Sequence, residues 1–303
     1  MNALKLLQKP KFWFVGIAVS LIAIHLSLVS KTAPTFFLGT SVLFWLAVAS
    51  RIWEKRDHLS LKNENFSSFM GATIIILAII KIFSLNDYDP FMRLFPLISA
   101  LGLGLIASGG IKGLKPYCQE LILLIVLAIP PELITKPINQ LIGVSALTGK
   151  FSSFVLWHLG YEVSSQGEFI IQPTGSIWIS PECAGLVTLL WLLQLSALFL
   201  AMFPLELSQK ILVPIVAVLT GFVVNGLRIA HLAVLAVSNQ EAFNYWHSEN
   251  AQIFSLLDVL IIGLFCFFLI RQEEVEDDID LAPKTLPKQG CFNHESATTN
   301  YQQ

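Results

Sequence analysis

The chain contains about eight apolar stretches that are each long enough to cross a lipid bilayer. A hydrocarbon core of about 30 Å is spanned by roughly 20 residues of α-helix. Inside lipid every backbone polar group needs a partner within the structure, so such stretches are expected to be helical. The sequence therefore predicts an all-α polytopic integral membrane protein. The expected spans are Phe12–Ser30, Pro34–Ser50, Phe66–Leu85, Phe91–Gly109, Gln119–Thr135, Ala184–Phe203, Ile211–Val237 and Ile253–Ile270.

The composition agrees with a membrane protein and excludes several other classes. Of the 303 residues, 54% are hydrophobic and 13% are charged, so the apolar surface exceeds what a soluble domain of this length can bury. The net charge is -2 and the basic residues are scattered, which gives no positive face for nucleic acid. The four cysteines show no CxxC spacing, so we expect no disulfide framework, no metal site and no cofactor.

Lysine and arginine are distributed unevenly between the two sides of the expected spans. By the positive-inside rule both termini then lie in the cytoplasm. The first apolar segment lacks a small-residue cleavage site, so we expect it to stay as a span. Residues 1–271 are expected to form one membrane domain, and the acidic residues 272–303 a disordered cytoplasmic tail. The cytoplasmic side carries Lys5, Lys9, Lys11, Arg51, Lys55, Arg56, Lys62, Lys112, Lys115, Lys210 and Arg271, and the outer side Lys31, Lys136 and Lys150, with Arg93 near an outer helix end.

One outer loop, residues 136–183, is long and has regular apolar patterning. Between Ile138 and Leu159 apolar residues recur at spacings near three and four, which indicates an amphipathic helix on the outer membrane interface. Further along, two short apolar runs flank Pro173–Ser176, as in a β-hairpin. We therefore expect a small extracytoplasmic cap that leads the chain into the sixth span at Cys183.

Three side chains with catalytic potential fall in the outer leaflet, although they lie far apart in the sequence. Cys183 begins the sixth span, Arg228 lies in the seventh about 13 Å below its outer end, and His247 precedes the eighth. A thiol is a strong nucleophile near a base, a positive charge or the start of a helix. His247 can accept the thiol proton and later protonate a leaving amine. Arg228 can stabilise an oxyanion or bind a carboxylate, and a charge at that depth indicates function.

These residues stand in three short motifs that resemble those of a known family. "SPECAGL" lies at the head of the sixth span, "NGLR" spans Asn225–Arg228, and a histidine precedes the last span. In order, spacing and sidedness they resemble the exosortase/archaeosortase family, most closely its cyanobacterial exosortases, over most of the chain. The cysteine is followed by Ala184, where relatives often carry serine.

The resemblance implies a multi-pass cysteine transpeptidase of the bacterial plasma membrane. Its partners are expected to be exported proteins with a C-terminal PEP-CTERM-type sorting signal: a short Pro-Glu-Pro-like motif, a transmembrane helix and a basic cluster. Cleavage near that motif is expected to pass through a cysteine thioester. The resemblance gives Cys183 the role of nucleophile, Arg228 that of oxyanion or substrate ligand, and His247 that of acid and base.

Further polar residues are candidates for supporting roles. Asn225 lies one helical turn before Arg228 and is expected to orient it. His231 follows Arg228 by three residues on the same face, which makes it a second candidate for the base. Asp258, in the eighth span, lies at a depth where it can pair with Arg228. Glu182 is expected to point toward the interface or a substrate.

Two interpretations from other classes remain open on the residues alone. One is a secondary transporter or channel in which Arg228, Asp258 and His231 line a pathway. The other is a non-catalytic membrane scaffold for exported proteins, which would not depend on the thiol. A transporter needs polar residues near the midplane and on both sides, whereas this sequence gathers them near the outer face.

Overall fold

The structure is a computed structural model that describes residues 10–33, 35–55, 64–248 and 252–281. In the first half the helices are α2 (Pro10–Thr32), α3 (Thr35–Glu54), α4 (Asn65–Phe83), α5 (Phe91–Ser108), the 3-10 helix η2 (Ile111–Tyr117), α6 (Cys118–Ala128) and α7 (Pro131–Ile142). The second half contains α8 (Val144–His158), strands β1 (Ser164–Gln166), β2 (Phe169–Gln172) and β3 (Gly175–Trp178), then α9 (Leu186–Met202), α10 (Leu207–Ser238), α11 (Gln240–His247) and α12 (Gln252–Leu281).

The prediction of an all-α polytopic membrane protein is confirmed. Six of the helices are long and apolar enough to cross a membrane, and they match the first four and the last two expected spans. The sixth expected span is α9, an apolar helix of 17 residues. α12 continues to Leu281, past the boundary expected at residue 271, and residues 282–303 of the predicted tail lie outside the described residues.

The fifth expected span, Gln119–Thr135, is bent at its proline pair and is not one straight helix. α6 ends at Ala128, and the chain turns by 71° before it continues as α7. The cause is the pair Pro130–Pro131: Pro130 is extended, with φ -74° and ψ 123°, and Pro131 begins the new helix. A proline disfavours helical backbone in the residue before it but fits the first helical turn. If the bent pair is one span, the described residues contain seven spans.

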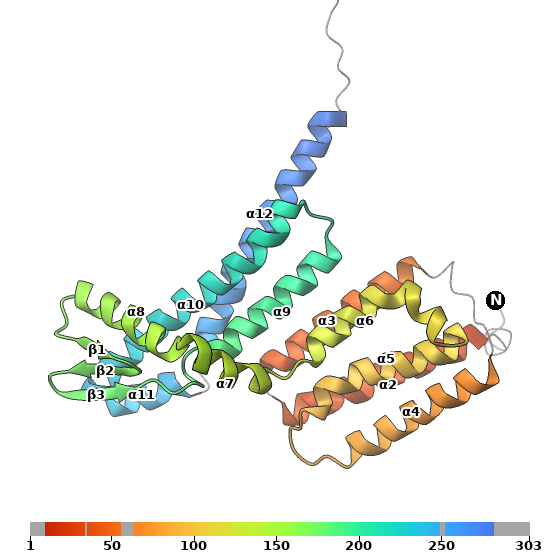
Figure 1. The fold of residues 1–303 in the computed structure, drawn as a ribbon, viewed down its shortest axis with the longest axis horizontal. Coiled ribbons are helices and arrows are strands. Elements are labelled where there is room, and N and C mark those ends of the chain that lie inside the picture. The colour runs from red at the N-terminus through yellow and green to blue at the C-terminus, as the bar shows by residue number, and fades with distance from the viewer. Residues whose placement is uncertain (1–9, 34, 56–63, 249–251, 282–303) are drawn as a thin grey trace, which may run out of the picture.

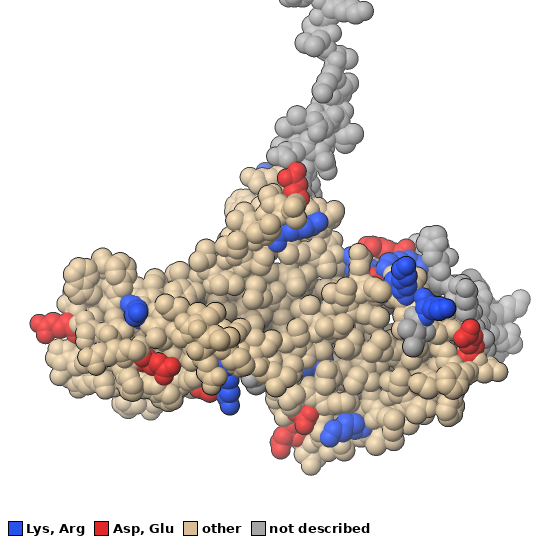
Figure 2. Space-filling view, in the orientation of Figure 1, with Lys and Arg blue, Asp and Glu red and all other residues tan. Residues whose placement is uncertain are grey.

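The helices form two neighbouring groups with a small mixed region at one end. Figure 1 shows α2 to α6 on one side, α9, α10 and α12 in the middle, and α8, α11 and the three strands together at the other end. Bulky apolar side chains such as Phe37, Phe44 and Phe95 fill the core of the first group. On the face shown in Figure 2, charged side chains lie near the edges and a wide uncharged area covers the helices.

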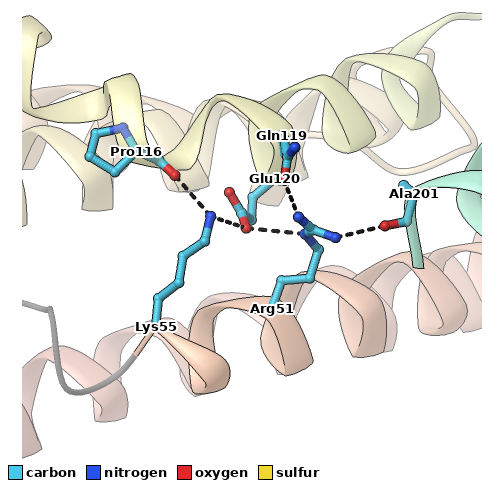
Figure 3. A network of polar contacts seen from close by, with 6 residues as sticks. All are labelled: Arg51, Lys55, Pro116, Gln119, Glu120 and Ala201. Carbon is cyan, nitrogen blue, oxygen red and sulfur yellow. Dashed lines mark hydrogen bonds and ion pairs between the residues drawn. The ribbon is translucent and has the colours of Figure 1, made fainter. Parts of the chain in front are cut away.

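The end of the first group opposite the strands is tied together by a buried carboxylate. Glu120 on α6 is 2% exposed and accepts from Lys55 Nζ at 2.7 Å and from Arg51 Nε at 3.3 Å. Arg51 also donates to the Ala201 carbonyl at 2.6 Å and to the side chain of Gln119 (Figure 3). One arginine thus joins the ends of α3, α6 and α9. Because α9 has 17 residues, this network lies about 25 Å from the start of that helix.

The loop expected as a cap is more structured than predicted. Instead of one interfacial helix it contains α7 and α8, separated at Gly143, whose φ of +68° ends the first helix. Instead of a hairpin it contains a three-stranded antiparallel sheet in the order β1-β2-β3. The β2–β3 pair is the expected hairpin, with Gln172 opposite Gly175. We call α7, α8 and the sheet, residues 131–178, the cap.

Small polar residues fasten the cap to α10. The buried face of α8 carries Ser145, Thr148, Gly149 and Ser152. Side chains of this size let two helices approach closely in a membrane, and Ser152 Oγ donates to the Gly226 carbonyl at 2.8 Å. The sheet adds a bond of 3.1 Å from Gln172 to a carbonyl of α10. The cap is therefore fixed to the membrane helices beside the start of α9.

Candidate active site

Cys183 lies in a tight turn between β3 and α9. The N–H groups of Cys183 and Ala184 both donate to the Ser180 carbonyl, at 2.9 and 3.0 Å. α9 begins at Leu186 and not at the predicted Ala184, because Gly185 has a left-handed φ of +85° and caps the helix. The half-buried thiol therefore precedes the helix by three residues and packs against the apolar core that joins the cap to α9 and α10.

Asn225 and Gly185 hold this turn against α10. Asn225 Nδ2 donates to the Cys183 carbonyl at 3.1 Å. A Cβ at position 185 would lie 2.6 Å from Cγ of Asn225, so the approach and the positive φ both require glycine. Asn225 thus contacts the backbone of the residue that carries the thiol, whereas we expected it to orient Arg228. The observed contact fixes the position of the cysteine backbone.

Helix α11 brings His247 to the thiol. Asn239 follows the end of α10 and caps α11, accepting a hydrogen bond from the Ala242 N–H at 3.0 Å. His247 ends α11, and its ring stacks on Phe243 with centroids 5.1 Å apart and planes 12° apart. Its Nε2 lies 3.7 Å from Sγ of Cys183. An imidazole at this distance can accept the thiol proton and return it to a leaving group.

Arg228 is the third predicted residue at this place. It lies on α10 one helical turn after Asn225, whose side chain contacts the Cys183 backbone. Its Nε is buried and has no hydrogen-bond partner among the described residues. The structure therefore brings together Cys183 from the turn before α9, Arg228 from α10 and His247 from α11. A thiol, a base and a cation at one point form a site suited to acyl transfer.

The other two candidates lie beside this group and do not touch the sulfur. His231 is exposed and packs edge-on against Trp246, with ring centroids 5.5 Å apart. Of the two candidate bases, His247 is the one whose polar contact with the Cys183 sulfur is observed. Asp258 on α12 is 2% exposed and lines the same cavity as Arg228, but the described residues show no ion pair between them.

Glu182, next to the nucleophile candidate, is a surface residue. Its side chain is exposed. Hydrogen bonds from its own backbone N–H and from the Ser180 side chain, with a smaller contribution from Lys136, lower the pKa of its carboxyl below the usual value. Glu182 is therefore an ionised surface group that helps to define the turn at Ser180.

Several residues that build the site were not singled out from the sequence. Gly185 follows the cysteine within "SPECAGL", and a glycine at the start of an apolar run was a signal for a special backbone conformation. Thr148 on α8 donates to the Ala184 carbonyl at 3.3 Å, which connects the cap to the cysteine turn. No sequence spacing indicates that contact. Among the described residues no three His, Cys, Asp or Glu side chains are grouped to hold a metal ion.

Comparison with protein families gives one finding. The model of the family described as transmembrane exosortase matches residues 30–263, which include the cysteine turn, Arg228 and His247. No curated protein and no solved structure matches the chain.

Proposed function

This chain belongs to the transmembrane exosortase family, whose members process sorting signals in the membrane, and we propose that it is a cysteine transpeptidase. Its substrates are exported proteins that end in a PEP-CTERM-type sorting signal. Cys183 is the nucleophile, His247 the acid and base, and Arg228 the ligand of the oxyanion. The likeness to cyanobacterial exosortases stays a prediction, and nothing in the family match favours a transporter.

The proposed reaction has two acyl-transfer steps. Cys183 Sγ attacks the carbonyl carbon of the scissile peptide bond while His247 takes the thiol proton. Arg228 stabilises the negative charge that forms on the carbonyl oxygen. The C–N bond then breaks, and His247 gives its proton to the leaving amine. A thioester to Cys183 remains, and an acceptor nucleophile attacks it, releases the thiolate and gives up its own proton to His247.

The location of the site supports a substrate that is still embedded in the membrane. Cys183 and Arg228 lie at the start of α9 and within α10, at the end of the helices that carries the cap. The basic side chains Arg51 and Lys55 lie at the other end of α9 and α3. We propose that the basic end faces the cytoplasm, by the positive-inside rule, and that the site faces the extracytoplasmic side of a bacterial plasma membrane.

The observation that carries this proposal is the 3.7 Å contact between Cys183 Sγ and His247 Nε2. In the test, the protein is coexpressed with a reporter that carries a PEP-CTERM signal. The size of the reporter is then measured on a gel. Wild type is expected to remove the signal, and Cys183→Ala is expected to leave it in place while reaching the same membrane level. Normal removal by Cys183→Ala would overturn the proposed function.

A further inference from the structure

A cavity of about 740 Å³ lies beside the cysteine turn, between α3, α9, α10 and α12. It adjoins the candidate site, because Asn225 and Arg228 line it together with Ser248, the residue after His247. On another side its lining includes Leu43 on α3 and Leu256 on α12, which are 47% and 68% exposed. The cavity therefore opens onto the apolar outer surface of the helices and reaches Arg228 and Asn225 of the candidate site.

Among the described residues two charged side chains line the cavity, and each carries a buried atom without a hydrogen-bond partner. Arg228 supplies one positive group from α10, and Asp258 supplies one negative group from α12. Within the described residues, Nε of Arg228 and Oδ1 of Asp258 are buried and have no hydrogen-bond partner. A buried donor or acceptor without a partner is destabilising, and a charged one more so. Two such groups in one cavity indicate a ligand that offers an acceptor to Arg228 and a donor to Asp258.

An extended peptide main chain has this pattern of groups. Every residue other than proline presents one C=O acceptor and one N–H donor. In a helix crossing the membrane these groups are paired within the helix, but around a bond that is to be cleaved the helix must be unwound. Unwound backbone at membrane depth is tolerated only where protein groups satisfy it. Most other lining residues, such as Phe36 and Trp191, are apolar and suit the side chains of such a segment.

We propose that this cavity binds an unwound segment of the substrate's own membrane helix, with Asp258 accepting a main-chain N–H and Arg228 donating to a carbonyl. This inference rests on the proposed function and assigns the substrate's path to the thiol. Asp258 is then a positioning residue for the peptide. Arg228 has five N–H donors, so it serves both a neighbouring carbonyl and the carbonyl that reacts.

Substitutions at position 258 can show whether the group that Asp258 binds is an amide N–H or a cation. Asparagine keeps an oxygen that accepts an N–H hydrogen bond, but it does not neutralise an ammonium group. Leucine removes the acceptor and branches at the same carbon as aspartate, but it is larger. Because Asp258 borders the cavity and its removal takes away a buried acceptor without a partner, we expect Asp258→Leu to fold. Gly263→Ala is the control, because Gly263 is also on α12, does not line the cavity, and its added Cβ would meet nothing within 4 Å.

The test uses the purified full-length protein in lipid nanodiscs with a peptide that contains a PEP-CTERM signal. In the cleavage assay, Asp258→Leu is expected to raise KM about ten- to hundredfold, as expected from losing a hydrogen bond to a charged group, with a much smaller change in kcat. Asp258→Asn and Gly263→Ala are expected to stay within a few fold of wild type. A wild-type KM for Asp258→Leu would overturn the inference. So would an increase in KM for Asp258→Asn as large as that for Asp258→Leu.

A binding measurement keeps the inference separate from the proposed function. A photoreactive amino acid at Leu43, in the Cys183→Ala background, is expected to crosslink to the peptide, and the added Asp258→Leu change is expected to reduce the yield about tenfold or more. The yield should return with Asp258→Asn. Crosslinking to lipid in place of peptide would contradict the inference. So would a crosslinking yield that does not change with the residue at position 258. If Cys183→Ala still cleaves the reporter, the proposed function fails, while the crosslinking result reports on the cavity alone.

Discussion

Sγ of Cys183 and Nε2 of His247 lie 3.7 Å apart, although 64 residues separate them in the sequence. The contact exists because two short elements end at the same place. The Ser180–Cys183 turn closes the cap before α9, and α11 folds back after α10 through the Asn239 cap. The pair therefore depends on the cap and on the α10–α11 corner as much as on the two side chains.

The two candidate bases can be separated by a matched pair of variants. His247→Ala removes the ring beside the sulfur and is expected to lower the cleavage rate about 10²- to 10⁴-fold, the contribution typical of general acid–base catalysis. His231→Ala removes an exposed ring that contacts Trp246 and is expected to keep the rate within a few fold. The measurement is reporter cleavage by the two proteins at equal concentration. Loss in His231→Ala with normal cleavage by His247→Ala would exchange their roles.

The glycine after the Cys-Ala pair gives a test of the cysteine turn. Gly185→Ala adds a Cβ 2.6 Å from Asn225 Cγ, so it should push α10 away from the turn and lower cleavage at least tenfold. Gly143→Ala is the control, because Gly143 also has a positive φ but nothing lies within 4 Å of the added Cβ. Both changes should cost about 1–2 kcal/mol of stability through backbone strain. Equal cleavage by the two variants would count against a role for the close packing at Gly185.

The buried carboxylate at the other end of the helices should affect stability and not chemistry. Glu120→Gln leaves Lys55 and Arg51 without their shared anion. Both cations are partly exposed, so the expected loss is about 1–3 kcal/mol, between a surface pair and a fully buried pair. Thermal unfolding in detergent measures it, and reporter cleavage below the unfolding temperature should match wild type. A large loss of cleavage with unchanged unfolding would show a functional role for this network.

Much of the fold could be predicted from the sequence because membrane spans are long and uniformly apolar. The bend in the fifth span lies at Pro130 and Pro131, a pair that indicates a helix break from the sequence itself. Strand β1 (Ser164–Gln166) was not predicted because it is short and polar. It is defined by its pairing with β2 and not by its own sequence pattern. Pairing of this kind depends on tertiary contacts that a local window does not contain.

The candidate site could be predicted in part for the same reason. Cys183, Arg228 and His247 were placed in the outer leaflet by counting residues along expected helices, and depth is a property that a helix preserves. A helix does not determine the lateral position of its side chains in the same way. The contacts of Asn225 with the Cys183 carbonyl and of Thr148 with the Ala184 carbonyl depend on how the helices pack and on how each is rotated about its axis. Asp258 was expected to pair with Arg228, but both side chains instead face a cavity.

The central claim is that the sorting signal is cleaved through a thioester on Cys183. The direct measurement is mass spectrometry of the enzyme after rapid quenching during turnover of a PEP-CTERM peptide, with and without hydroxylamine. The account predicts an adduct on Cys183 with the mass of the acyl fragment, and hydroxylamine should remove it. The adduct should be absent from Cys183→Ala. In His247→Ala it should accumulate only if acylation still occurs in that variant. An acyl adduct on Cys118 or Cys266, or full turnover by Cys183→Ala, would contradict it.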